Sequence, residues 1–212
     1  FVVARMKALG LDISVDAIGN VTGVYAGEEA LPMVMMGSHI DTVGTGGLYD
    51  GNYGVMAGLE VIATLQEAGL RARRPLAVTF FTNEEGVRFQ PDMMGSVVFA
   101  GEYPLEAALA AKDREGITLD EALRAIGYRG ERRPGDMSVD SYVELHIEQG
   151  PILDKEGTDI GVVTGVQGIS WQELTLTGVS NHAGTTPMSM RHDAGLAAAK
   201  IAVFVRELAL NL

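Results

Sequence analysis

Two uninterrupted apolar runs constrain the fold of this chain most strongly. Residues 31–40 read LPMVMMGSHI and residues 76–81 read LAVTFF, which is typical of strands that are buried on both faces. Between them, residues 55–68 carry apolar side chains at helical spacing, and Gly69 follows as a stop signal. A strand, a helix and a second buried strand in this order predict neighbouring parallel strands with a helix packed on the sheet.

The alternation of strands and helices continues along the chain. We expect a short helix over residues 120–127, a polar loop over 129–138, and further strands over 142–147 and 160–166. Glycine accounts for 27 of the 212 residues, and many glycines stand at the ends of apolar runs, where tight turns are needed. The predicted fold class is therefore α/β, with a mostly parallel sheet and helices on both faces.

The sequence pattern changes near residues 166–168. Residues 171–179 alternate polar and apolar side chains, as a half-exposed strand does, and residues 192–210 have helical spacing. We therefore expect a first domain over residues 1–166 and the start of a smaller α/β domain over 167–212. The chain does not begin with Met, and its last helical pattern stops without Gly or Pro, so we expect both ends to be truncated.

Charge and composition exclude several classes of protein. The chain has 16 Lys and Arg against 28 Asp and Glu, for a formal net charge of −12, which argues against binding to nucleic acid or to an anionic membrane surface. No apolar run approaches the roughly 20 residues of a membrane span. The absence of Cys excludes disulfides, thiolate metal ligands and a Cys nucleophile, and it fits a reducing compartment such as the cytoplasm.

Three clusters of imidazole and carboxylate side chains fall near the ends of expected strands, where open α/β sheets bind ligands. The clusters are His39, Asp41 and Asp50; Glu84 and Glu85; and His146, Glu148 and Gln149. Each has an ordinary structural explanation, as a hydrogen-bonded imidazole, a turn residue or solvated surface charge. Their convergence at one sheet edge suits Zn²⁺, Mn²⁺ or Co²⁺ bound by nitrogen and oxygen, and a shared carboxylate would suit two ions.

The adjacent glutamates are expected to divide their roles. Two neighbouring carboxylates repel each other, so the pKa of one should rise unless a cation lies between them. One of the pair would bind metal while the other stays free as a general base. Asp41 lies two residues after His39 in an extended segment, so both side chains can share one side of the strand.

Four segments carry a resemblance to a known family. They read GSHIDTVGTGGLYDGNYGV (residues 37–55), FTNEEGVRF (81–89), LHIEQGPIL (145–153) and GVSNHAGTTPMSMRHDA (178–194). Together they resemble the hydantoinase/carbamoylase family of metal-dependent amidohydrolases, within the aminoacylase and carboxypeptidase group of two-metal enzymes. The resemblance covers nearly the whole chain and is strongest to the N-carbamoyl-L-amino-acid hydrolases.

The resemblance implies a role for each matching residue. Two divalent metal ions, Zn or else Mn, Co or Ni, would be bound, the first by His39, Asp50 and His146 and the second by Asp50 and Glu85, with Asp50 bridging. Glu84 would be the general base, with Asp41 as the carboxylate behind His39. Substrate would contact Gln149 and His182.

The resemblance also implies an activity and an assembly. The reaction would be hydrolysis of an N-carbamoyl-L-amino acid to the amino acid, CO₂ and ammonia, by a cytoplasmic homodimer that forms through the smaller lid domain. His182 would reach the partner subunit's site. A last ligand His and the residues that bind the substrate carboxylate are expected beyond the end of this chain, and His192 is interpreted as structural.

Other functions remain open at this stage. β-Ureidopropionase, allantoate amidohydrolase and dipeptidase or N-acyl hydrolase activities keep the chemistry and change the substrate. A catalytically silent metal-binding or dimerisation module is the alternative outside enzymes. A nucleotide-binding fold is disfavoured, because the GTGG at residues 44–47 does not continue into a G-x-G-x-x-G motif.

Overall fold

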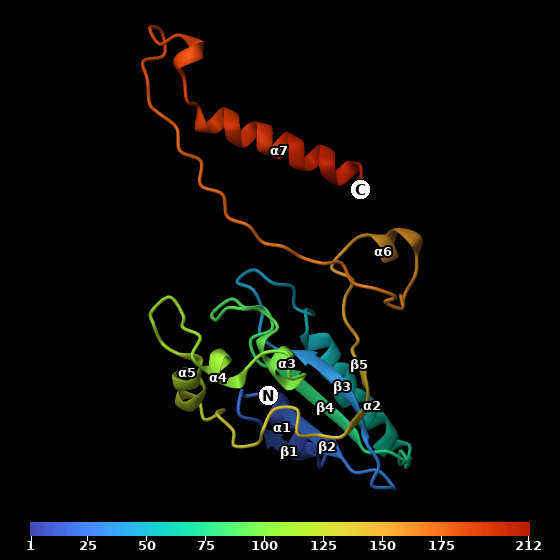
Figure 1. Ribbon diagram of the computed structural model, residues 1–212. Helices are drawn as coiled ribbons and strands as arrows, with labels where there is room; N and C mark the ends of the chain where they lie inside the picture. The colour runs from blue at the N-terminus through green and yellow to red at the C-terminus, as the bar shows by residue number, and fades with distance from the viewer. The chain divides into compact units, whose positions relative to one another are not determined.

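The computed structural model describes all 212 residues as two compact units, residues 1–159 and residues 160–212. Figure 1 shows that the first unit holds the sheet and most of the helices. The boundary expected at residues 166–168 falls inside the second unit and stays a prediction.

The first unit is built on a five-stranded sheet with the strand order β1-β2-β4-β3-β5. The strands are β1 (Asp12–Val15), β2 (Val21–Tyr25), β3 (Met33–His39), β4 (Leu76–Phe81) and β5 (Val139–Val143). Strand β3 pairs in parallel with β4 and β5, whereas β2 pairs antiparallel with β1 and β4. The sheet is therefore mixed, and the prediction of a mostly parallel sheet is wrong for its β1–β2 side. A short turn suffices to join antiparallel strands, so this hairpin needs no crossover helix.

One face of the sheet is covered by α1 (Val2–Ala8) and α2 (Asn52–Glu67). Helix α2 confirms the helix expected between the two apolar strands, and its N-terminus lies three residues before residue 55. The core on this face consists of Met6, Leu11, Val21, Val55, Leu59, Ile62, Leu76, Val78 and Phe80. Alternate residues of β4 thus pack against the helices, and this fixes the register of β4 beside β3.

The opposite face of β4 meets α3 (Met94–Phe99), where the ring of Phe99 lies 5.7 Å from the ring of Phe81. A second core joins α3 to α4 (Leu105–Leu109) and α5 (Leu119–Ala125). Helix α5 confirms the helix expected over residues 120–127, and Thr118 opens it with a capping box. Helices therefore lie on both faces of the sheet, as expected.

The chain after β5 differs from the sequence prediction. Strand β5 ends at Val143, before the expected end at residue 147, and α6 (Ile152–Glu156) follows. Residues 160–166 and 171–179 form no strand, so both strand predictions are wrong. These residues are exposed and have no neighbouring strand to pair with, and an alternating pattern alone does not satisfy the backbone hydrogen bonds of a strand.

The second unit contains a 3₁₀ turn, η1 (Met188–Met190), and the long helix α7 (Ala194–Leu210). Helix α7 confirms the helix expected over residues 192–210, and the side chain of Asp193 caps its N-terminus. No helix of the structure combines the length and the hydropathy that a membrane span requires.

Candidate active site

His39 lies at the carboxyl end of β3, and its side chain is only 3% exposed. Its Nδ1 lies 2.9 Å from the carbonyl oxygen of Asp41. Because a carbonyl oxygen only accepts, Nδ1 must carry the proton that it donates. The other nitrogen, Nε2, is then available as a metal ligand when the imidazole is neutral.

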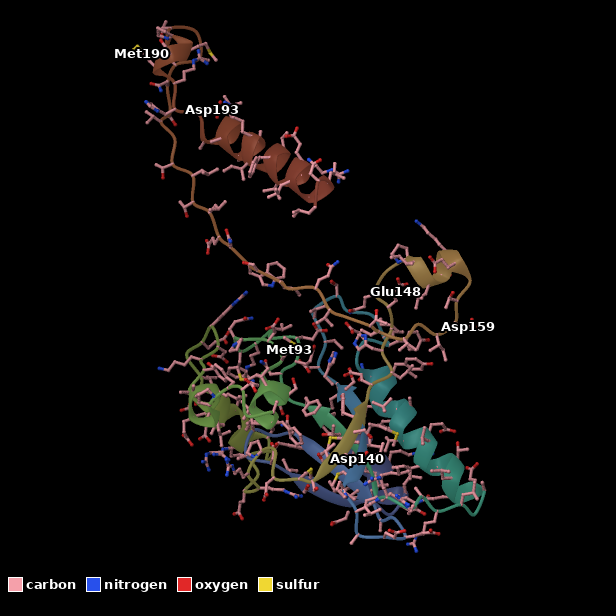
Figure 2. The ribbon with its side chains drawn as sticks, turned by 45° about the vertical axis from the view of Figure 1, so that its right-hand side comes forward. Met93, Asp140, Glu148, Asp159, Met190 and Asp193 are labelled. Carbon is pink, nitrogen blue, oxygen red and sulfur yellow. The ribbon has the colours of Figure 1, made fainter.

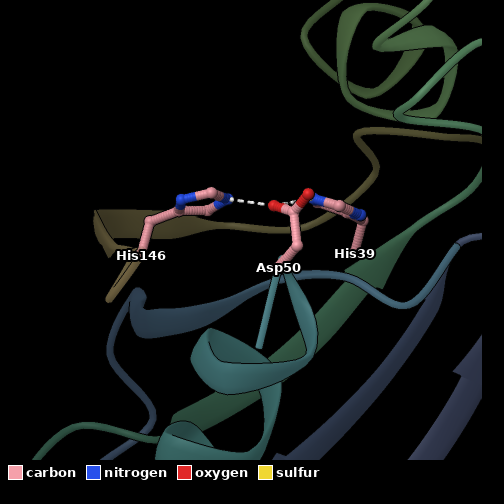
Figure 3. Close-up of side chains that lie close together, drawn as sticks. All are labelled: His39, Asp50 and His146. Atoms are coloured by element: carbon pink, nitrogen blue, oxygen red, sulfur yellow. Dashed lines mark ion pairs between the residues drawn. The ribbon is translucent and has the colours of Figure 1, made fainter. Parts of the chain in front are cut away.

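Asp50 lies between two imidazole rings, as Figure 3 shows. Its Oδ1 is 3.3 Å from Nε2 of His146 and 4.0 Å from Nε2 of His39. Nδ1 of His146 lies 2.8 Å from the carbonyl oxygen of Ile147. As in His39, Nδ1 therefore carries the proton and Nε2 is free. Two Nε2 lone pairs therefore face one carboxylate, an arrangement that requires a proton or a metal ion between them.

Glu84 and Glu85 follow β4, and their carboxylates lie close to His39. Oε2 of Glu84 lies 3.4 Å from Nε2 of His39. Oε1 of Glu85 is buried without a hydrogen-bond partner. An orphaned carboxylate oxygen beside other acidic groups indicates a place for a cation.

The pKa of each glutamate is raised, but only the pKa of Glu85 is raised in part by its neighbour, as the sequence suggested. For Glu85 the main cause is burial, and the negative charges of Asp50 and Glu84 add to it. For Glu84 burial is again the main cause, and it outweighs the charge of His39, which lowers the pKa. Burial thus contributes more than the repulsion between the neighbours that the sequence suggested.

The side chains fit a divalent metal ion. Two groups bring their ligand atoms within 4.8 Å of one another, namely His39, Asp50 and His146, and His39, Glu84 and Glu85. The donor set contains imidazole nitrogens and carboxylate oxygens without thiolates, which suits Zn²⁺, Mn²⁺ or Co²⁺. A cation here would also relieve the repulsion among the carboxylates.

Asp41 was expected to place its carboxylate behind His39, but the structure shows different contacts. Its carboxylate lies 3.7 Å from Nδ1 of His39, whereas its carbonyl oxygen makes the shorter contact. The carboxylate oxygens instead accept the backbone N–H groups of Glu84 and Glu85, at 3.3 and 3.1 Å. Asp41 therefore holds His39 through its backbone and the glutamate loop through its side chain.

Glycines allow the backbone to approach the cluster closely. Gly51 has a φ of +64°, and a Cβ there would lie 2.5 Å from ring atoms of His39. A Cβ at Gly54 would lie 2.5 Å from the carbonyl oxygen of Leu145, in the segment that precedes His146. The Gly-rich sequence after β3 signalled such an approach, but the sequence does not show which groups meet.

One supporting residue, Glu144, was missed from the sequence, whereas Glu148 belongs to the third expected cluster. Glu144 accepts hydrogen bonds from Ser38 at 2.5 Å and from the hydroxyl of Tyr142 at 3.1 Å. It thereby ties the segment before His146 to β3. The carboxylate of Glu148, labelled in Figure 2, accepts the N–H groups at the start of α6, so it caps that helix.

The two expected substrate contacts are exposed and remain proposals. Gln149 has a φ of +54° and lies between the Glu148 cap and α6. His182 belongs to the second unit, where its Nδ1 accepts hydrogen bonds from the N–H groups of Gly184 and Thr185. His192 contributes its backbone carbonyl oxygen to a hydrogen bond with the N–H of Val179, and the structural interpretation of its side chain stays a prediction.

Comparison with known proteins points to one family. Residues 35–209 match the family described as Peptidase family M20/M25/M40. The chain is 47% identical over 204 residues to an N-carbamoyl-L-amino-acid amidohydrolase of Rhizobium meliloti, covering 95% of this chain and 49% of that protein. It is 43% identical to the protein of the same name from Geobacillus stearothermophilus, covering 97% and 51%.

Other similar proteins include one that is named for a different substrate and a solved structure. The chain is 40% identical to a ureidoglycolate hydrolase of Arabidopsis thaliana, covering 95% of this chain and 44% of that protein. Its structure resembles a hydantoinase/carbamoylase family amidase from Burkholderia ambifaria with a TM-score of 0.83 and 45% identity, covering 99% of this chain and 52% of that one. The chain therefore spans about half the length of the relatives it matches.

Proposed function

Because this chain belongs to peptidase family M20/M25/M40, we propose that it forms part of a metal-dependent amidohydrolase. This enzyme cleaves the ureido C–N bond of N-carbamoyl-L-amino acids. The products are the amino acid, CO₂ and ammonia. The observation that carries the proposal is the convergence of Nε2 of His39 and Nε2 of His146 on the carboxylate of Asp50. Two amidohydrolases named for this substrate are 47% and 43% identical to the chain.

Two divalent ions, Zn²⁺ or else Mn²⁺, Co²⁺ or Ni²⁺, are proposed as the cofactor. The ligands supplied by this chain are His39, Asp50 and His146 for one ion and Asp50 and Glu85 for the other. When bound, such ions polarise a carbonyl group and lower the pKa of water toward 7. The buried, unpartnered Oε1 of Glu85 supports its assignment as a ligand.

The chain's own residues move protons and orient the substrate. Glu84 remains one-third exposed while it lies 3.4 Å from His39, so its carboxylate is accessible to a water molecule. It takes a proton from the attacking water and delivers it to the leaving nitrogen. His182 donates a hydrogen bond to the oxyanion that develops on the ureido carbonyl, and the amide of Gln149 orients the ureido group.

A panel of substrates tests the choice of reaction. The metal-loaded protein would be assayed for ammonia release from an N-carbamoyl-L-amino acid, N-carbamoyl-β-alanine, ureidoglycolate and allantoate, and for amine release from a dipeptide and an N-acetyl amino acid. The proposal expects the highest kcat/KM on the N-carbamoyl-L-amino acid. A preference for any other member of the panel would replace the substrate, and no turnover of any of them would leave a silent metal-binding module.

We also propose a cytoplasmic homodimer in which the second unit forms part of a lid and His182 reaches the partner subunit's site. Mixing Glu84→Gln and His182→Ala chains tests this assembly. A mixed dimer would contain one site with an intact glutamate and an intact partner histidine, so activity should return. If subunit exchange is demonstrated and no activity returns, His182 does not act across subunits.

A further inference from the structure

Arg191 bridges two carbonyl groups of the turn that carries His182. Its Nε donates to the carbonyl oxygen of Thr186 at 3.0 Å, and its NH2 group donates to that of Ala183 at 2.5 Å. Figure 2 labels Met190 and Asp193, which flank this arginine between η1 and α7. One planar guanidinium thus fixes two points of the turn, which a single ammonium group does not match.

The residues with these two carbonyl groups flank, in the sequence, the residues whose N–H groups contact His182. Gly184 and Thr185 lie between Ala183 and Thr186, and their N–H groups donate to Nδ1 of His182 at 3.1 and 3.2 Å. Nδ1 is therefore an acceptor on both contacts and carries no proton. The proton of the neutral ring must then lie on Nε2.

We propose that Arg191 is a positioning residue for His182. It holds the turn so that two backbone N–H groups face Nδ1, and the ring presents Nε2–H as a hydrogen-bond donor. Such a donor suits the developing oxyanion of a ureido carbonyl. The substrate role rests on the proposed function, whereas the tautomer of His182 does not.

The first experiment reads the tautomer directly. Long-range ¹H–¹⁵N spectra of ¹⁵N-histidine-labelled protein would be recorded at a pH where imidazoles are neutral, with His182→Ala used to assign the signals. We expect the Nε2–H tautomer in the wild type and in the control Arg206→Met, which replaces an exposed arginine of α7. Arg191→Met and Arg191→Lys should both give a mixture of tautomers. An unchanged tautomer in a folded Arg191→Met protein would overturn the proposal.

The second experiment asks whether Arg191 acts through His182. Arg191→Met should lower kcat by about 10²-fold, as a displaced catalytic group does, without a change in metal content. In a His182→Ala background the same substitution should add almost nothing, because the group that it positions is absent. Equal losses in both backgrounds would contradict the proposal. If the wild type hydrolyses no ureido compound, the proposed function fails, while the tautomer measurement still decides the role of Arg191.

Discussion

Oδ2 of Asp41 accepts a hydrogen bond from the backbone N–H of Glu85 at 3.1 Å. The other oxygen of Asp41 accepts the N–H of Glu84, and the carbonyl oxygen of Asp41 contacts Nδ1 of His39. One residue therefore connects the carboxyl ends of β3 and β4. The relative placement of the imidazole and the two glutamates depends on this connection.

Asp41→Asn should weaken metal binding without unfolding the protein. An amide offers one acceptor oxygen, and its NH₂ group would face the second backbone N–H. We expect metal affinity to fall by about 10–100-fold, as is typical when a residue that orients ligands is changed. Equilibrium dialysis against a metal buffer measures this, with Asp12→Asn at the exposed start of β1 as the control. Equal affinity in the two variants would contradict the role of Asp41.

Glu84→Gln and Glu85→Gln should have different effects. Loss of the general base lowers kcat by roughly 10²–10⁴-fold, so Glu84→Gln should retain metal and lose turnover. Glu85→Gln should lose metal, because a neutral amide replaces the carboxylate whose buried Oε1 has no hydrogen-bond partner and binds a divalent cation more weakly. Metal analysis and ammonia release on both variants check this pair. The reverse pattern would show that the two glutamates exchange roles.

Gly51→Ala should disrupt the cluster from the backbone side. Its positive φ disfavours any side chain, and the added Cβ would lie 2.5 Å from the ring of His39. We expect a lower melting temperature and a loss of bound metal. Gly44→Ala is the matched control in the same loop, because a Cβ at Gly44 meets nothing within 4 Å. Similar melting temperatures and metal contents for the two variants would show that this contact is unimportant.

Arg88 and Asp113 should make stability depend on pH. Burial alone would raise the pKa of Asp113, but hydrogen bonds from the N–H of Ile117 and from Arg88 hold it below its usual value of 3.8. The unfolded chain then binds more protons between these two pKa values, so stability falls as the pH falls below about 3.8.

Urea unfolding of the wild type and Arg88→Met across this range checks the pair. The difference in unfolding free energy should be constant above about pH 5 and should shrink as the pH falls further, because Asp113 of the folded Arg88→Met protein takes up its proton at a higher pH than Asp113 of the folded wild type. A difference that does not change with pH would mean that Arg88 stabilises the fold through its contact with Phe89 rather than through Asp113.

Much of the first unit could be predicted because its apolar patterns are long. The runs that became β3 and β4, and the helical spacing of α2, are local signals strengthened by burial. The β1–β2 hairpin was missed because its strands have only four and five residues. Residues 171–179 show that an alternating pattern does not make a strand when no neighbouring strand pairs with it.

The side chains that gather at the candidate site could be predicted, whereas the contacts between them could not. The sequence places His39 and Glu84 at strand ends, and parallel pairing of β3 with β4 brings those ends together. Which atom of Asp41 faces His39 depends on the backbone path after β3. The bridging of two carbonyl groups by Arg191 depends on the shape of the turn, and spacing alone does not specify either.

We propose that His39, Asp50, His146 and Glu85 hold the metal needed for hydrolysis of a ureido bond. The most direct measurement is ammonia release from an N-carbamoyl-L-amino acid by chelator-treated protein as Zn²⁺, Mn²⁺ or Co²⁺ is added back. We expect no release without metal, recovery when metal is added, and no recovery in Asp50→Ala. Ammonia release that is unaffected by the chelator, or that recovers fully in Asp50→Ala, would contradict the proposal.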